Sequence, residues 1–190
     1  VPRTWHARPM TPPAQRGSTG RGAGKGGSTH PESEVSGARA VVAVGSEDFL
    51  AERIVTAIVA DARRSDPDVE RRDVDLAAES ARGDVTEACS PNLFGSAAVV
   101  VARNAESADD QSVAVLVEAV AQGDVRLVVL HPGGVKGRKV LDALVLGGFV
   151  QASCEKAKGR AVDEFVAREF QHARRRATPD ALEALRAAVG

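Results

Sequence analysis

The chain has 190 residues, of which 43% are hydrophobic, and a formal net charge of −1 at pH 7. This length accommodates one hydrophobic core plus part of a second unit, and the balanced charge excludes a uniformly basic nucleic-acid-binding protein. No run of apolar residues comes close to the length of a membrane-spanning helix, which is about 18 residues. Cys89 and Cys154 lie far apart without the spacing of a zinc site, so we expect buried free thiols, no metal, no cofactor and a reducing cytoplasmic location.

The N-terminal part differs in composition from the rest. Residues 1–38 hold five of the nine prolines and seven of the 18 glycines, and five Arg and Lys minus two Glu give a charge of +3, which leaves −4 for the remainder. Because such a segment buries too little apolar surface to offset its ordering entropy, we expect residues 1–37 to form a disordered basic tail. Val1 in first position, with Met10 as the only Met, suggests a non-ATG start or an incomplete sequence.

One stretch of this tail imitates a phosphate-binding loop. Residues 20–26 are rich in Gly and include Lys25, but Thr19 stands where the motif has its first Gly, and Gly26 stands where Ser or Thr must hold magnesium. The stretch also neither follows a strand nor opens a helix. We therefore reject a nucleotide site here.

From residue 39 onward, short apolar runs alternate with segments of helical periodicity. The expected strands are 40–44, 69–76, 97–102, 125–130 and 149–153, and the expected helices are one through Leu50, Ile54 and Ile58, then 83–89, 109–122 and 136–146. This alternation predicts an α/β fold with a mostly parallel five-stranded sheet and helices on both faces. We assign residues 38–157 to this domain.

The pattern changes after Cys154. Val162, Phe165, Val166 and Phe170 mark a long helix, and Thr178 with Pro179 predicts the N-cap and first turn of another helix. Helices without strands indicate the beginning of a separate all-helical domain, 158–190, which we expect to be incomplete. Its apolar faces should be partly exposed and prone to fraying.

The turns after the strands argue against a nucleotide enzyme. The first strand is followed by Gly45-Ser46-Glu47-Asp48, whose carboxylates favour a helix N-terminus but repel a triphosphate. Asp75 could imitate the ribose-binding acid of a dinucleotide enzyme, but the required Gly-x-Gly-x-x-Gly is absent. The Gly-rich, basic loop 131–139 could hold a phosphate or a DNA backbone, or it is only a tight turn with a basic helix start. His131 has no partner that would make it a catalytic base.

A hydrophobic pair lies in the connection 90–95. Pro91 drives Ser90 out of the helical region, so Ser90 is predicted as N-cap and Pro91 as the first helical residue. Leu93 and Phe94 would then project from one stiff turn, a geometry that fits a plug for another protein's pocket. The alternative is that both side chains fold back into the core.

Four stretches together carry a resemblance to a known family: 44–50, 90–95, 131–137, and 165–166 with 177–179. In this order and spacing, residues 40–190 resemble the N-terminal part of the DNA polymerase III delta subunit, the clamp-opening member of the bacterial clamp loader, in its actinobacterial form. The resemblance implies an AAA+/RecA-like fold without a phosphate-binding loop. It assigns the hydrophobic wedge that enters the sliding clamp to Leu93 and Phe94, although Ser96-Ala97-Ala98 replaces the family's usual charged pair.

The implied function is mechanical. The chain would bind the sliding clamp (the beta subunit) and help to open it for loading onto DNA during replication, without hydrolysing ATP and without a catalytic site of its own. Other clamp-loader subunits would be partners, and primed DNA would be reached only through the DNA-directed DNA polymerase III holoenzyme, a nucleotidyltransferase complex. Two alternatives stay open: a stand-alone α/β nucleotide-binding enzyme or sensor, and a basic DNA-binding module.

Overall fold

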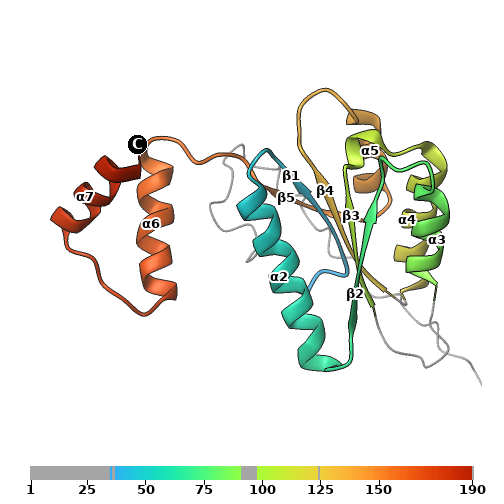
Figure 1. Ribbon diagram of the computed structural model, residues 1–190, viewed down its shortest axis with the longest axis horizontal. Helices are drawn as coiled ribbons and strands as arrows, with labels where there is room; N and C mark the ends of the chain where they lie inside the picture. The colour runs from blue at the N-terminus through green and yellow to red at the C-terminus, as the bar shows by residue number, and fades with distance from the viewer. Residues whose placement is uncertain (1–34, 36, 91–97, 124, 190) are drawn as a thin grey trace, which may run out of the picture.

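The computed structural model describes residues 35, 37–90, 98–123 and 125–189 (Figure 1). In chain order the elements are β1 (Ala40–Val44), α2 (Asp48–Ser65), β2 (Glu70–Asp75), α3 (Ala81–Cys89), β3 (Ala98–Arg103), η1 (Ala105–Ser107), α4 (Asp110–Gln122), β4 (Val125–His131), α5 (Arg138–Leu146), β5 (Val150–Ser153), α6 (Arg160–His172) and α7 (Pro179–Val189). The strands form one parallel sheet in the order β2-β3-β4-β1-β5. The expected α/β fold is confirmed.

The position of each strand in the sheet follows from its composition. β1 and β3 are apolar almost throughout and are buried over nearly their whole length, as parallel strands covered on both faces must be. β2 instead reads Glu-Arg-Arg-Asp-Val-Asp and lies at an edge of the sheet. Charged side chains on an edge strand discourage pairing with another chain, so this edge is protected.

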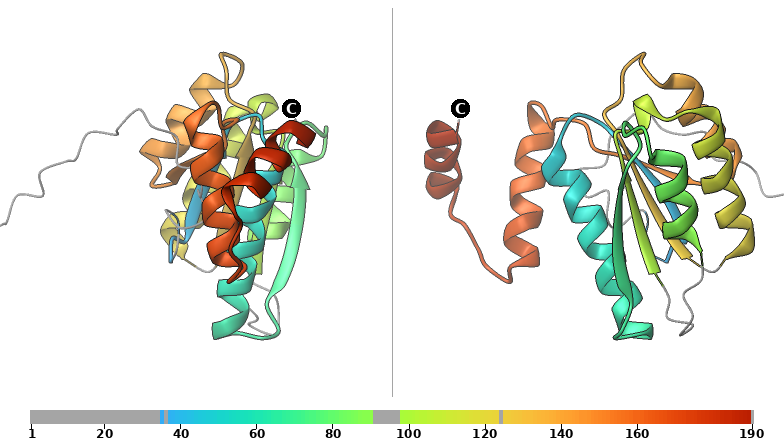
Figure 2. Two further views of the ribbon diagram at one scale, coloured as in Figure 1. Left: turned by 90° about the vertical axis from the view of Figure 1, so that its left-hand side faces the viewer. Right: turned by 45° about the vertical axis from the view of Figure 1, so that its right-hand side comes forward.

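Helices α3, α4 and α5 cover one face of the sheet, and α2 covers the other (Figure 2). Successive residues of β1 show the division, since Val42 belongs to the core under α4 and α5 whereas Val41 belongs to the core under α2. The β-to-α turns after β1, β3 and β4 therefore share the carboxyl edge of the sheet. The end of α3 and the start of β3 lie at the opposite, amino edge.

The start of α5 and the presence of η1 differ from the sequence expectation for local reasons. Helix α5 begins at Arg138 rather than at residue 136, because Gly137 has a φ of +72° and cannot belong to the helix. The short helix η1 was not expected; it follows Asn104, a non-glycine residue with a φ of +57°. Helix α4 is capped by Asp109, whose carboxylate accepts a 2.6 Å hydrogen bond from the Ser112 N–H.

One residue of the expected tail belongs to the packed structure. Val35 is buried against the core on the α2 face, and its carbonyl accepts a 2.9 Å hydrogen bond from the Ala38 N–H. Val35 therefore packs with the domain whose start was expected at residue 38. The remainder of the expected tail, 1–34 and 36, lies outside the described residues.

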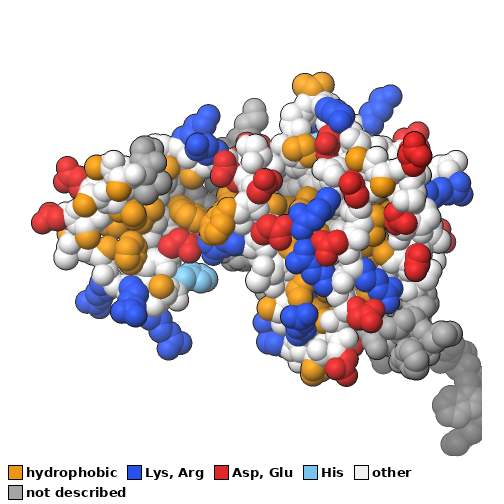
Figure 3. Space-filling view, in the orientation of Figure 1, with side chains coloured by type: hydrophobic (Ala, Val, Ile, Leu, Met, Phe, Trp, Pro, Cys, Tyr) orange, Lys and Arg blue, Asp and Glu red, His pale blue; other side chains and the backbone are white. Residues whose placement is uncertain are grey.

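The last two helices stand beside the sheet domain rather than within it (Figure 1). No residue of α6 is fully buried, and α7 begins as expected, with Thr178 Oγ1 accepting from the Ala181 N–H at 3.3 Å. An apolar groove of about 600 Å³ runs between the two helices, lined by Val162, Val166, Pro179, Leu182 and Leu185 among others. Figure 3 shows apolar side chains at the surface over α6 and α7, as expected for partly exposed faces.

Phe165 of α6 contacts the sheet domain. It packs against the core on the α2 face, and the Arg53 guanidinium lies over its ring at 5.9 Å and over the Phe49 ring at 5.6 Å. Arg53 also forms an ion pair with Glu169. Among the described helices none is long and apolar enough to cross a membrane.

Candidate partner-binding surface

The predicted wedge residues, Leu93 and Phe94, lie outside the described residues, but both flanks of their segment are described. Ser90 is the C-cap of α3, and Ala98 begins β3. Because α3 runs antiparallel to the strands, both of these flanking points, Ser90 and Ala98, lie at the amino edge of the sheet. This edge is opposite to the one where open α/β sheets bind small ligands.

Ser90 leaves the helix in the way that Pro91 demands. Its φ of −72° and ψ of 139° are extended, which is the conformation favoured before a proline. The Ser90 N–H donates to Glu87 O at 3.1 Å, and its hydroxyl donates to Thr86 O at 2.7 Å. The expected exit from helical geometry is confirmed, whereas the expected cap for a turn at 91–94 concerns residues that are not described.

Arg72, on the edge strand β2, contacts this helix end and was not identified from the sequence. Its Nη1 donates to the carbonyls of Ala88 at 3.0 Å and Ser90 at 3.2 Å. Its Nε and Nη2 donate to the Glu70 carboxylate at 3.2 and 2.9 Å. A cation at this place satisfies the last carbonyls of α3 and opposes the negative end of the helix dipole.

Cys89 is the last residue of α3 and is buried beside this contact. Burial raises the pKa of its thiol to about 11, and the nearby positive charge of Arg72 lowers that pKa in part. Cys154, the residue after β5, is also buried. Both cysteine side chains are buried, as expected.

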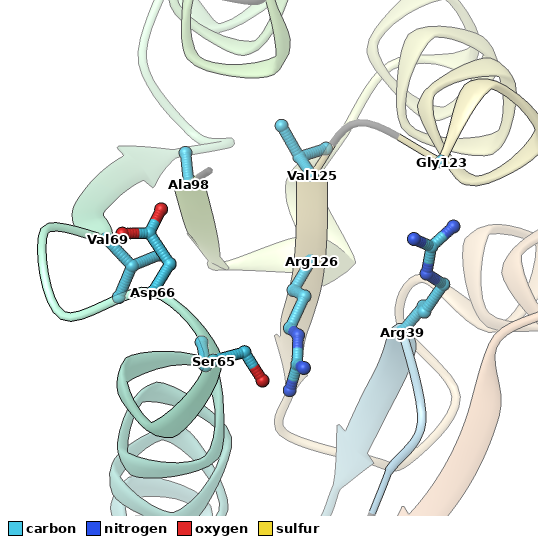
Figure 4. Close-up of a pocket in the computed structure, with 9 residues that line it drawn as sticks. Arg39, Ser65, Asp66, Val69, Ala98, Gly123, Val125 and Arg126 are labelled. Atoms are coloured by element: carbon cyan, nitrogen blue, oxygen red, sulfur yellow. The ribbon is translucent and has the colours of Figure 1, made fainter. Parts of the chain in front are cut away.

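A pocket of about 190 Å³ opens at the same amino edge (Figure 4). Arg39 points its guanidinium toward Gly123 at the end of α4, and Arg126 forms an ion pair with Asp61 of α2. The hydrogen bond from Arg126 holds the pKa of the Asp61 carboxyl below its ordinary value. Arg39 therefore faces the C-terminus of α4, and Arg126 faces an acid of α2. Both arginines thus have a structural role within the chain.

At the carboxyl edge, the turn after β1 uses its amides internally. The Gly45 N–H donates to His131 O at 3.0 Å, and the Glu47 N–H donates to Cys154 O at 3.0 Å. A phosphate-binding loop needs such N–H groups to point at the ligand. The amides of Gly45 and Glu47 are therefore not available to a phosphate.

The cavity beside this turn has a volume of about 180 Å³, below the roughly 300–1,000 Å³ of small-molecule sites. Asp48 and Glu106 line it, and Glu106 Oε2 is buried without a hydrogen-bond partner among the described residues. Arg103 also lines the cavity, but its guanidinium pairs with Glu52 and Asp73, so the two carboxylates of the lining still disfavour a nucleotide phosphate. The described residues also hold no cluster of metal ligands.

Asp75, the acid considered for a ribose, has a structural role. Its Oδ1 accepts from Asn104 Nδ2 at 2.7 Å and from the Ala77 N–H at 2.9 Å. The hydrogen bond from Asn104, followed by that from Ala77, lowers the pKa of the Asp75 carboxyl. The carboxylate thereby joins the ends of β2 and β3.

The loop 131–139 is stabilised mainly by its own buried histidine. His131 Nδ1 accepts from the Gly133 N–H at 3.0 Å, so Nε2 carries the proton and donates to Gly137 O at 3.2 Å. Lys136 donates to Ser107 Oγ at 2.9 Å, and Arg138 pairs with Asp142 at 3.1 Å. These contacts favour the tight-turn interpretation over a phosphate or DNA site.

Comparison with known proteins finds a likeness in structure alone. No protein-family model matches the chain, and no curated protein matches its sequence. Among solved structures, the chain is similar to the Bacillus subtilis DNA clamp loader delta protein (YqeN), with a TM-score of 0.57 and 16% sequence identity over 81% of this chain. The match covers 49% of that protein, so the chain spans about half its length. The chain has a delta-like α/β fold.

Proposed function

We propose that this chain is a delta-type clamp-loader component that binds a sliding clamp through Leu93 and Phe94 and helps to open it. The observation that carries the proposal is the fold similarity to a clamp loader delta protein over 81% of the chain. At 16% identity this likeness concerns the fold, so the assignment of function rests on the fold together with the residue pattern 90–95.

The flanks of the segment support its use as a contact. Arg72 and the hydrogen bonds of Ser90 hold the end of α3, and β3 at the other flank is a central, buried strand. A segment between two fixed ends presents its side chains with a smaller entropic cost on binding. Burying Leu93 and Phe94 in a partner would contribute roughly 1.5–3 kcal/mol each. The sum of the two contributions corresponds to an increase in affinity of about a hundredfold to ten-thousandfold.

Ring opening follows from a difference in affinity. A ligand shifts an equilibrium only by its differential affinity for the two states, so the wedge must bind the open clamp more tightly than the closed one. ATP would act on the other loader subunits, because the turn after β1 in this chain has its amides at Gly45 and Glu47 occupied. Primed DNA would be a partner only through the assembled loader.

Two rival functions are less well supported. A nucleotide-binding enzyme would need groups that donate hydrogen bonds to a phosphate at the end of β1. The small cavity at this place is lined by the carboxylates of Asp48 and Glu106. A DNA-binding module would need free cations, yet Lys136 and Arg138 of the basic loop contact Ser107 and Asp142. Neither rival accounts for a Leu-Phe pair in the connection 90–95.

The test is surface plasmon resonance against the immobilised sliding clamp from the same genome. We expect the wild-type chain to bind and the variant L93A/F94A to bind at least about a hundredfold more weakly. The control is V145A/L146A at the end of α5, where Val145 and Leu146 are 42% and 88% exposed; it should bind like the wild type. Equal binding by L93A/F94A, or its unfolding by circular dichroism, would refute the proposal.

A further inference from the structure

Two pairs of side chains, each four residues apart on its own helix, meet between α2 and α6. On α2 the pair is Phe49 and Arg53, and on α6 it is Phe165 and Glu169. The Arg53 guanidinium lies 5.6 Å from the centroid of the Phe49 ring and 5.9 Å from that of the Phe165 ring. It also forms the ion pair with the Glu169 carboxylate. One cation therefore joins the sheet domain to the helical pair α6–α7.

The charges of this joint are partly shielded from water. The Arg53 and Glu169 side chains are 21% and 36% exposed. By contrast, Arg64, which pairs with Asp61 further along α2, is 70% exposed. Because solvent screens the Arg53 contact less, it is stronger than an ordinary surface ion pair. The aromatic rings add a cation–π attraction to it.

The chain that connects the two units imposes few constraints of its own. Residues 155–159, between β5 and α6, belong to no helix or strand. Gly159 has a φ of +56°, and no atom lies within 4 Å of a Cβ added there. Helix α6 lies alongside α2 (Figures 1 and 2), yet none of its residues is fully buried. The connection therefore leaves the orientation of α6 to its side-chain contacts.

We infer that Arg53 is a latch that holds the helical pair α6–α7 in one orientation against the sheet domain. With the latch closed, α6 lies along α2. Without the guanidinium, Phe165 loses its cation and Glu169 loses its opposite charge. Orientations in which α6 has turned about residues 155–159 then become populated. The inference concerns the chain alone and does not depend on clamp binding.

Exchanging the two charges of the ion pair gives the sharpest test. R53E places two carboxylates opposite each other, and E169R places two guanidinium groups there, so each single variant should open the latch. In R53E/E169R opposite charges face one another again. The exchanged guanidinium then lies four residues from Phe165, a ring of its own helix. The double variant should therefore close the latch, whereas independent local damage by the two substitutions would add up.

The measurement is the distance between two spin labels in the full chain, by double electron–electron resonance. The labels are attached to A114C on α4 and A167C on α6, both at exposed positions, while the native cysteines are buried. The wild type should give one narrow distribution of distances. In R53A, and in each single charge reversal, the ratio of other distances to this one should rise about tenfold. R53E/E169R should return close to the wild type.

The matched control is R64A, which removes the more exposed arginine of the same helix and should leave the distribution unchanged. E169R leaves α2 intact, so it tests the latch even where a change within α2 disturbs that helix. Four results would overturn the inference. They are a wild-type distribution in R53A, a double variant R53E/E169R as open as its single variants, equal opening in R64A and R53A, and a broad distribution in the wild type itself.

Discussion

Gly45 packs against the backbone carbonyl of Cys154, and only a glycine fits there. A Cβ at Gly45 would lie 2.2 Å from both the carbonyl carbon and the oxygen of Cys154, and the residue has a φ of +150°. This approach lets the end of β1 meet the end of β5, where the Glu47 N–H donates to Cys154 O. The same contact that closes the turn occupies an amide that a phosphate would need.

Replacing this glycine should be costly. We expect G45A to lower the free energy of unfolding by at least about 2 kcal/mol, because the new methyl group would collide with backbone and the φ is strained for alanine. Urea denaturation followed by circular dichroism measures the change. The control is G134A, where the φ is +77° but no atom lies within 4 Å of the added Cβ. A smaller loss for G45A than for G134A would contradict this packing.

Alkaline pH should destabilise the fold through Cys89. Burial raises the pKa of this thiol from 9.0 to about 11. The unfolded chain therefore loses the proton at lower pH than the folded chain does. The contribution of the Cys89 thiol to the free energy of unfolding is therefore fully present below pH 9, and it is lost as the pH rises through about 11. Urea unfolding between pH 8 and 11 should show this decline in wild type, and C89A should show a shallower one. Equal slopes would refute the assignment.

The helical pair α6–α7 should open more readily than the sheet domain. Amides of α6 and α7 should exchange with deuterium much faster than those of β1, β3 and β4, since no residue of α6 is fully buried whereas the central strands are. Hydrogen exchange read by mass spectrometry compares these elements in one sample. Equal protection of α6 and β4 would show that the apolar groove is covered in solution.

The sequence predicted the fold well where periodicity and burial agree. Val41 and Val42 show why, since these neighbouring residues of β1 pack into the cores on opposite faces of the sheet. A strand that is covered on both faces is apolar throughout, and such a run can be recognised from the sequence alone. The start of α2 directly after this turn was also predictable, because Glu47 and Asp48 favour a helix N-terminus. Helix starts were less accurate, as at Gly137, where a positive φ delays α5 by two residues.

Contacts between distant residues could not be predicted. Arg72 lies 16 residues before Ala88 in the sequence, and its charged neighbours make β2 look like an ordinary solvated edge. Val35 sits in a Gly-rich and Pro-rich context that indicates disorder, yet its side chain fills a place against α2. The position of Leu93 and Phe94 stays a prediction, since it depends on a partner as much as on the chain.

Photo-crosslinking tests the central claim most directly. A benzophenone-bearing phenylalanine analogue is introduced in place of Phe94, and in a second protein in place of Leu146, which is 88% exposed on α5. With the sliding clamp from the same genome, irradiation should join the clamp to the protein labelled at position 94 and not to the one labelled at position 146. Crosslinks from position 94 that stay within its own chain while the clamp is bound would contradict the account.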